Sequence, residues 1–199
     1  MNIKLLKIRP EHLEKIRLWR MSQEVTKYMF TDPIISSENQ NEWFKKVIQQ
    51  DLLRMDWVIN VNGADIGVVW LYDINPIHKR CYWGCYIAEE DFRMSGVGGI
   101  VELNVLKYVF DELLLNKLCC EVFEWNSLAI KTHKRCGFKV EGICREHVWK
   151  RGQFHNIFIM AILRKEWYQE VKNKYCTFLI ADIEEWKEKV LYLMTLTLN

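Results

Sequence analysis

The sequence has no long apolar run and no excess of charge of one sign. No stretch approaches the ~20 apolar residues that a membrane-spanning helix needs, and residues 1–7, MNIKLLK, lack the uninterrupted apolar core of a secretory signal peptide. The 28 basic and 26 acidic residues leave a formal net charge of +2, too little for an overall field that holds a protein on nucleic acid or on an anionic membrane. We therefore expect a soluble, cytoplasmic protein with a small-molecule partner.

The cysteines and histidines lack the spacing of a metal site or a disulfide framework. The seven cysteines are an odd number, and no two of them form a Cys-x-x-Cys pair. This pattern favours reduced thiols. Metal-ligand spacing is also missing from His12, His78, His147 and His155. We expect no metal.

No repeat, low-complexity tract or flexible linker divides the 199 residues, half of which are hydrophobic. Periodicity and turn signals predict the order βααβββαβαββ and thus one α/β domain with a mixed sheet. The predicted strands are 3–8, 57–61, 64–72, 80–88, 117–123, 140–151 and 154–163, with tight turns at 62–63 and 151–152. The predicted helices begin near Pro10 and Ser37 and span 100–114 and 127–136. Residues 169–199 show loosely helical spacing, and we expect a C-terminal helical extension that packs on the 1–168 domain or on the second subunit of a homodimer.

A glycine-rich loop between a predicted strand and a predicted helix is the best candidate for a binding site. The loop reads Arg93-x-x-Gly96-x-Gly98-Gly99. Glycines let the backbone approach an anion closely, and the N–H groups at a helix start point toward it. We interpret this loop as a pyrophosphate-binding loop, with a tight turn before a helix as the alternative. It is neither a Walker A loop, because no Lys-Ser/Thr follows, nor a dinucleotide fingerprint, because it comes mid-chain after antiparallel strands.

Two segments resemble the GNAT family of acetyl-CoA-dependent N-acetyltransferases. Residues 87–98, IAEEDFRMSGVG, look like the family's coenzyme A loop, Gln/Arg-x-x-Gly-x-Gly/Ala. Residues 121–138, EVFEWNSLAIKTHKRCGF, resemble its strand–Asn–helix–Gly-Phe segment. The resemblance covers residues 1–168. It implies the GNAT fold, a mixed and mostly antiparallel sheet that is flanked by helices and splayed at the coenzyme A site.

The resemblance also implies acetyl-CoA as the co-substrate and a set of residues that bind it. In the family, the pantetheine arm pairs with backbone groups of the splayed strand, and an asparagine at the position of Asn126 usually hydrogen-bonds the arm. Asn126 also suits the N-cap of a helix, and both roles can hold. The residues implied to bind coenzyme A are Tyr86, Ile87, Ala88, Arg93, Met94, Ser95, Gly96, Val97, Gly98, Gly99 and Asn126.

Two side chains are implied to transfer protons. Attack of an amine on a thioester requires removal of a proton from the amine and delivery of a proton to the departing thiolate. Glu121 matches the carboxylate that several family members use as the general base. The alternative is a structural carboxylate on a strand. The family's usual carboxylate on the fourth strand has no counterpart here, because Tyr82 and Trp83 occupy that place. The usual general acid is a tyrosine, but the aligned residue is His133. An imidazolium could donate the proton if a nearby carboxylate kept it charged, and a solvent-facing helix histidine is the alternative.

The acceptor site of the family is built from the first two helices and the last hairpin, which are aromatic and basic in this sequence. Residues 16–29 are similar to the N-acetyltransferases of pseudaminic acid biosynthesis, which acetylate a UDP-linked 4-amino-4,6-dideoxy sugar. The similarity implies a nucleotide-sugar acceptor, because arginine suits a diphosphate and aromatic faces suit uracil or a sugar ring. The implied binding residues are Trp19, Arg20, Tyr28 and Trp149. The alternative places Trp19 in the core and leaves Arg20 as a solvated charge.

Three other functions stay open at this point. Residues 42–44, 73–80 and 152–154 resemble segments of spermidine-type polyamine acetyltransferases, although a polycation calls for an acidic site and the predicted acceptor wall is basic. N-terminal acetylation of a ribosomal protein is a second alternative. A coenzyme A-binding regulator without acid and base groups would keep the glycine loop and is the alternative outside enzymes.

Overall fold

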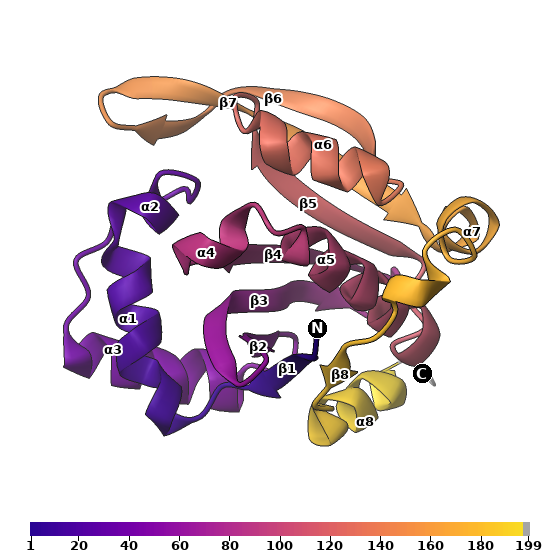
Figure 1. Cartoon of the computed structure of the whole chain (residues 1–199), viewed down its shortest axis with the longest axis horizontal. Coiled ribbons are helices and arrows are strands. Elements are labelled where there is room, and N and C mark those ends of the chain that lie inside the picture. The colour runs from indigo at the N-terminus through magenta and orange to yellow at the C-terminus, as the bar shows by residue number, and fades with distance from the viewer. Residues whose placement is uncertain (197–199) are drawn as a thin grey trace.

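The computed structural model of the chain describes residues 1–196. Eight strands form one sheet in the order β6-β7-β5-β4-β3-β2-β1-β8 (Figure 1). The strands are β1 Ile3–Lys7, β2 Met55–Val61, β3 Ala64–Asn75, β4 Arg80–Ile87, β5 Lys117–Phe123, β6 Lys139–Lys150, β7 Gln153–Leu163 and β8 Asp182–Ile183. The β4–β5 and β1–β8 pairs are parallel and the others antiparallel. The predicted mixed, mostly antiparallel sheet is confirmed.

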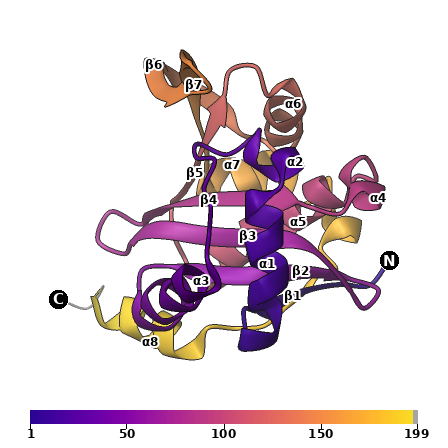
Figure 2. The same cartoon turned by 90° about the vertical axis from the view of Figure 1, so that its left-hand side faces the viewer.

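Helices cover both faces of this sheet. They are η1 Pro10–His12, α1 Leu13–Met21, α2 Gln23–Thr26, α3 Ser37–Trp43, η2 Phe44–Gln50, α4 Glu90–Arg93, α5 Val97–Lys107, η3 Tyr108–Glu112, α6 Ser127–Arg135, α7 Arg164–Glu166, η4 Trp167–Val171, η5 Cys176–Phe178 and α8 Lys187–Leu196. Because successive strand residues point to opposite faces, Val58 packs toward α1 and η2, and Trp57 packs toward α5 and η3. Figure 2 shows α1 and α3 in front of β2 and β3.

The two hairpins predicted from turn dipeptides, β2–β3 and β6–β7, form at those dipeptides. Asn62 and Gly63 have φ values of 53° and 90°, and Arg151 and Gly152 have φ values of 50° and 81°. Two successive residues with positive φ are the pattern of the two-residue turn that matches the twist of antiparallel strands. The second hairpin carries β6 and β7 beyond the rest of the sheet (Figure 1).

The sheet opens between its two central parallel strands. β4 and β5 pair at only three positions, Arg80 with Lys117, Cys81 with Leu118 and Tyr82 with Cys119. Both strands then continue, β4 to Ile87 and β5 to Phe123, without pairing to each other. Figure 1 shows β5 diverging from β4 under α6. The splay implied by the family resemblance is therefore present, and it leaves backbone groups of both strands free of sheet partners.

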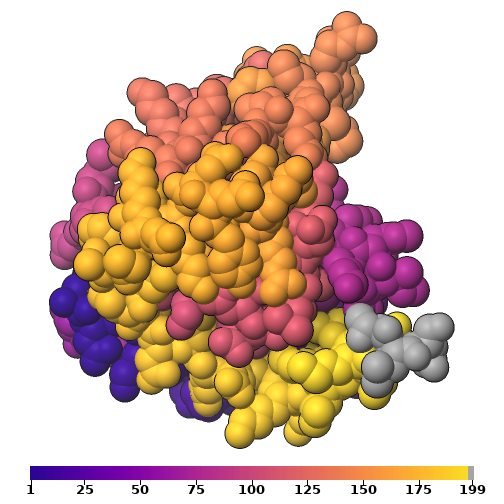
Figure 3. Space-filling model, turned by 90° about the vertical axis from the view of Figure 1, so that its right-hand side faces the viewer, coloured from indigo at the N-terminus to yellow at the C-terminus, as the bar shows by residue number. Residues whose placement is uncertain are grey.

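The tail after β7 covers one side of the molecule, as the amber to yellow surface in Figure 3 shows. Trp167 on η4 and Leu193 on α8 are buried. The tail also contributes a strand that we did not predict. β8 pairs with β1 through Lys4–Asp182 and Leu5–Ile183. Two residues are too few to show a period in the sequence.

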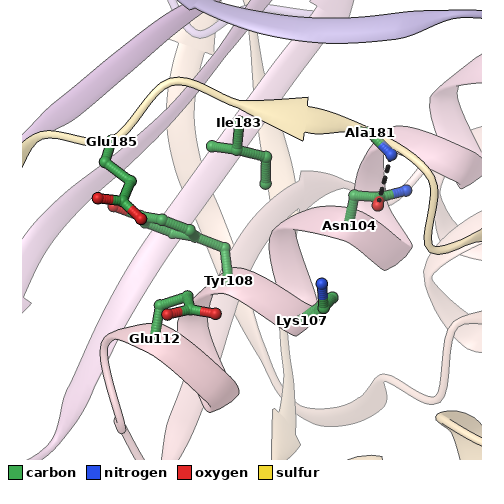
Figure 4. Close-up of a pocket in the computed structure, with 7 residues that line it drawn as sticks. All are labelled: Asn104, Lys107, Tyr108, Glu112, Ala181, Ile183 and Glu185. Atoms are coloured by element: carbon green, nitrogen blue, oxygen red, sulfur yellow. Dashed lines mark hydrogen bonds between the residues drawn. The ribbon is translucent and has the colours of Figure 1, made fainter.

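A small pocket of about 140 Å³ lies where the tail crosses α5 and η3 (Figure 4). Asn104 on α5 closes one side of it: its amide oxygen accepts a hydrogen bond from the backbone N–H of Ala181 at 3.0 Å, and its amide nitrogen donates to the carbonyl of Phe178 at 2.8 Å. None of the predicted site residues lines this pocket. Asn104 therefore fastens the tail to α5.

A buried lysine makes the second attachment of the tail. Lys189 on α8 is 3% exposed, and its ammonium donates to the carbonyls of Ile48 at 2.9 Å and of Arg54 at 2.6 Å. Beside it, the buried carboxylate of Asp56 accepts three hydrogen bonds from the Arg54 guanidinium. A buried charge is tolerated only when it is paired or fully hydrogen-bonded, so this contact fixes α8 against the start of β2.

We expect Lys189→Ala to lower the free energy of unfolding by about 2–4 kcal/mol, because two buried carbonyls lose charge-assisted hydrogen bonds. Chemical denaturation followed by circular dichroism measures the change. Lys187→Ala, at an exposed position of the same helix, is the control. Equal stability of the two variants would contradict the attachment.

Candidate active site

The predicted catalytic residues lie on opposite faces of the opening between β4 and β5. Cys120 follows the last paired residue of β5, and it faces α5 together with Trp83, the first unpaired residue of β4. The next residue, Glu121, points to the other face by strand alternation. The two faces of the opening therefore offer two separate chemical environments.

His133 lies at the point where the strands part. Its ring packs edge-on against Trp83, with 5.5 Å between centroids, and lies 5.5 Å from the ring of Phe138. Its Nδ1 is 2.8 Å from Oε1 of Glu102 on α5. The Glu102 side chain is 1% exposed and the His133 side chain 12%. His133 is therefore a buried histidine on a carboxylate, which differs from the solvent-facing alternative.

The carboxylate sets the charge of the imidazole. Burial by itself would lower the pKa of His133, but Glu102, assisted by Cys120, outweighs burial and raises that pKa well above its ordinary value. Because the pKa of His133 is higher in the folded state, protonation of His133 stabilises the fold. This stabilisation is fully present below the ordinary pKa near ~6.5, and it is lost as the pH rises through the folded-state pKa. Glu102 thus favours the protonated form of His133. A nearby carboxylate that favours the imidazolium is what the sequence analysis required for His133 to donate a proton.

Glu102 was not among the sequence candidates. It stands alone as a charged residue in the apolar run from Ile100 to Leu106 of a helix. A single carboxylate on a helix that is otherwise buried is rarely left unpaired. That pattern could have indicated a buried partner, although the sequence does not say which cation lies opposite.

Glu121 lies among tyrosines on the other face. The hydroxyl of Tyr72 donates to Oε2 of Glu121 at 3.3 Å, and the ring of Tyr82 lies 5.5 Å from that of Tyr72. Burial, followed by the charge of Glu121, raises the pKa of Tyr72, so Tyr72 stays a neutral hydrogen-bond donor. Glu121 keeps lone pairs that could accept a proton from an amine.

The glycine loop forms the predicted turn at the start of α5. Gly96 has a φ of 82° and is the N-cap of the helix. A Cβ on Gly98 would meet no heavy atom within 4 Å, so the space beside this residue in the first turn of the helix is open. The loop also contains Ser95, whose hydroxyl accepts from the N–H of Val97, and the exposed Met94. Val97 itself is fully buried and offers only its backbone.

Arg93 anchors the loop to the end of β4. Its guanidinium donates to the carbonyls of Ile87 and Ala88 and pairs with Glu24 at 3.1 Å. The N–H of Ala88 donates to the carbonyl of Ile66 at 2.7 Å. Part of the backbone that we expected to meet the pantetheine arm is thus engaged within the protein. Tyr86 is buried, with its ring against Trp70.

Asn126 is the N-cap of α6. Its side-chain oxygen accepts from the N–H of Ala129 at 3.3 Å, which is the capping role that we considered beside coenzyme binding. The cap fixes where α6 begins and so fixes the position of His133 two turns later.

The four predicted acceptor residues occupy different environments. Trp19 is 9% exposed and packs in the core, with its Nε1 donating to Glu89 at 3.1 Å; this matches the core alternative. Arg20 is partly buried. Its Nη2 donates to Thr31 at 3.1 Å, its Nη1 is buried and has no hydrogen-bond partner among the described residues, and burial lowers its pKa. Trp149 is exposed and lies against Phe154 near the tip of the β6–β7 hairpin.

Tyr28, the fourth, belongs to an aromatic cluster that sequence reasoning missed. We define the aromatic cluster as Tyr28, Phe30, Phe123, Trp125 and His155. Trp125 stacks on Phe123 with 4.9 Å between centroids, and its Nε1 donates to His155 at 3.3 Å. The cluster joins the loop after α2 to the end of β5 and the start of β7. These residues are far apart in sequence, so no local pattern indicates that they meet.

Asp32 closes the same region with ion pairs. Its carboxylate lies 2.6 Å from the ammonium of Lys150 and 3.4 Å from the guanidinium of Arg151. Lys27, on the same loop, pairs with Glu24 at 2.9 Å. Two carboxylates, Asp32 and Glu24, therefore offset part of the positive charge of the predicted acceptor wall.

Residues 2–139 match the family model of the acetyltransferase (GNAT) domain. The chain is 26% identical over 172 residues to spermidine N(1)-acetyltransferase of Escherichia coli (strain K12), which covers 86% of this chain and 91% of that protein. It is 28% identical over 130 residues to acetyltransferase PseH of Campylobacter jejuni (strain 81-176), covering 65% of this chain and 78% of that protein. The crystal structure of spermidine N-acetyltransferase from Vibrio cholerae in complex with CoA and spermine superimposes with a TM-score of 0.79 at 24% identity, covering 84% of this chain and 99% of that one.

The chain belongs to the GNAT acetyltransferase family. The predicted GNAT fold and the predicted acetyl-CoA-dependent N-acetyltransferase activity are confirmed by the family match and by the enzymes that the chain resembles. The comparisons favour the polyamine alternative over the nucleotide sugar that we put first, because the match to the spermidine enzyme covers more of both chains than the match to PseH. None of the described helices is both long and apolar enough to span a bilayer.

The open space at Gly98 gives a clean test of the loop. We expect Gly98→Glu to abolish the rise in melting temperature that acetyl-CoA produces in the unchanged protein, because a side chain and a negative charge would occupy the place of the pyrophosphate. The variant without ligand should melt normally, since its Cβ meets nothing in the fold. Undiminished coenzyme A binding, measured by calorimetry, would remove the loop from the site.

Proposed function

We propose that this enzyme transfers the acetyl group of acetyl-CoA to a primary amine of a spermidine-type polyamine, with Glu121 as the general base and His133 as the general acid. The observation that carries the catalytic assignment is the opening between β4 and β5, which has a carboxylate on one face and a carboxylate-bound histidine on the other. Amine acetylation requires one group that takes a proton and one that gives it.

The protein's residues divide the reaction between the two faces. Glu121 takes the proton from the attacking amine, directly or through water. Unpaired backbone N–H groups at the splay stabilise the oxyanion that forms on the acetyl carbonyl. His133 gives its proton to the departing thiolate. The loop from Arg93 to Gly99 binds the pyrophosphate of the coenzyme, and Asn126 with Tyr86–Ala88 aligns its arm.

The polyamine assignment rests on the relatives' substrates and on the charge of the acceptor side. Our sequence argument against a polycation was the basic wall. Asp32, paired with Lys150 and Arg151, and Glu24, paired with Lys27, offset part of that positive charge. The aromatic cluster offers faces that attract an ammonium group. Trp125 and Tyr28 are each more than 40% exposed and could receive the charged end of the acceptor while its reacting amine lies at Glu121.

A UDP-linked amino sugar is the second candidate, and Arg20 favours it. The unpartnered Nη1 of its buried guanidinium would gain a partner in a phosphate oxygen.

Coenzyme A release measured with spermidine, a UDP-4-amino sugar and a ribosomal N-terminal peptide separates the acceptors. We expect the highest kcat/KM with spermidine, and we expect Arg20→Ala to leave the spermidine KM unchanged. Turnover of the nucleotide sugar alone, with a KM that Arg20→Ala raises while the acetyl-CoA KM stays constant, would select the second candidate.

Glu121→Gln tests the general base. The substitution keeps the shape of the side chain but removes its basicity, so kcat should fall by about 10²–10⁴-fold at neutral pH with little change in coenzyme A affinity. The loss should shrink at high pH, where the free amine forms without help. Glu124→Gln is the matched control, because Glu124 lies three residues away, is exposed and only accepts a hydrogen bond from Asn156. A normal kcat in Glu121→Gln would leave Glu121 a structural carboxylate.

A further inference from the structure

We propose that Glu102 is a positioning residue for the acetyl transfer: it holds the His133 imidazole in its protonated form, with Nδ1 bound and Nε2 left to donate toward the opening between β4 and β5. This inference rests on the proposed function, in which His133 is the general acid. It adds a residue from a different helix, which the family resemblance did not assign.

The first support is the geometry of the pair. The 2.8 Å contact joins Nδ1 to a carboxylate oxygen, and both side chains are nearly excluded from solvent. A hydrogen bond at Nδ1 fixes the ring orientation and decides which nitrogen remains for other partners. Trp83 and Phe138 pack on the ring, so it cannot turn away without opening the core.

The second support is the electrostatic surroundings. Cys120 on β5 faces the imidazole, while Cys136, the C-cap of α6, and Cys85 on β4 face Glu102. Burial raises the pKa of the Cys120 thiol even though His133 opposes this shift; burial also raises the pKa of Cys136 and, to about 12, that of Cys85. The three thiols are thus neutral at physiological pH. Glu102 is the one carboxylate among the described residues that pairs with His133.

The third support is the demand of the chemistry. A buried neutral imidazole could hydrogen-bond the departing sulfur. It would lack the extra proton that an imidazolium can transfer to the thiolate. In a site with little water, a charge at short distance acts more strongly than at the surface. Without Glu102, burial would lower the pKa of His133 and the donor form would disappear at neutral pH.

The test combines Glu102→Gln with the pH dependence of kcat. In the unchanged enzyme, the protonated donor persists to a pH well above ~6.5, whereas in Glu102→Gln it is lost below that value. The ratio of the variant's kcat to that of the unchanged enzyme should therefore be near one at low pH. Above the new pKa the ratio should fall by about tenfold for each pH unit, until the unchanged enzyme also loses its proton. Glu112→Gln, on the exposed continuation of the same helix, is the control and should keep the unchanged profile.

A second background separates positioning from simple loss of structure. His133→Tyr installs a donor whose pKa near ~10 needs no carboxylate, so Glu102→Gln should cost little kcat there at pH 8. The same loss in both backgrounds, or a loss that does not vary with pH, would overturn the proposal.

A measurement without turnover distinguishes failure of this inference from failure of the proposed function. The carbon and nitrogen shifts of the labelled His133 ring, assigned by comparison with His133→Asn, report its protonation by NMR. We expect a titration midpoint above ~6.5 in the unchanged protein and a lower one in Glu102→Gln. Equal midpoints would overturn the role of Glu102 whatever the acceptor. A shifted midpoint with no kcat change in His133→Phe would instead keep the pair and remove His133 from catalysis.

Discussion

The early end of the pairing between β4 and β5 is the constraint on which the site depends. After Tyr82 and Cys119, the two strands no longer pair with each other. Their unpaired backbone N–H and C=O groups require other hydrogen-bond partners in a folded protein. The opening therefore has to be supported from both sides. α6 lies over it on one face, and the loop after α2 reaches it on the other through the aromatic cluster.

α5 connects three features that would otherwise be independent. Its first turn forms the glycine loop, Glu102 projects from its second turn to His133, and Asn104 binds the tail through Ala181. Glu102 and Asn104 are each 1% exposed, and a buried polar group without its partner is costly. The tail and the proposed proton donor, His133, are thus both hydrogen-bonded to α5. A disturbance of the tail would reach the site through this helix.

The features that the sequence predicted are those that local rules determine. Turn dipeptides, the N-cap at Asn126 and the glycines at 96–99 act within a few residues of themselves, so the hairpins, the start of α6 and the loop were predictable. The missed features arise between distant segments: Glu102 meets His133 from 31 positions away, and Lys189 meets Ile48 from 141. The spacing of residues along the sequence does not predict contacts between such distant pairs. Arg20 also shows this limit, because its burial depends on the loop that carries Thr31.

A histidine at position 133, in place of the family's tyrosine, requires a nearby negative charge to act as the general acid. A tyrosine donates as a neutral group, and burial, which raises a phenol's pKa, only keeps it protonated. A histidine donates as a cation, and burial works in the opposite direction. A buried histidine can therefore act as the acid only with a counter-charge, and this chain has one at 2.8 Å in Glu102. The two residues form one functional unit, since a lone Glu102 would be an unpaired buried charge and a lone His133 would be neutral.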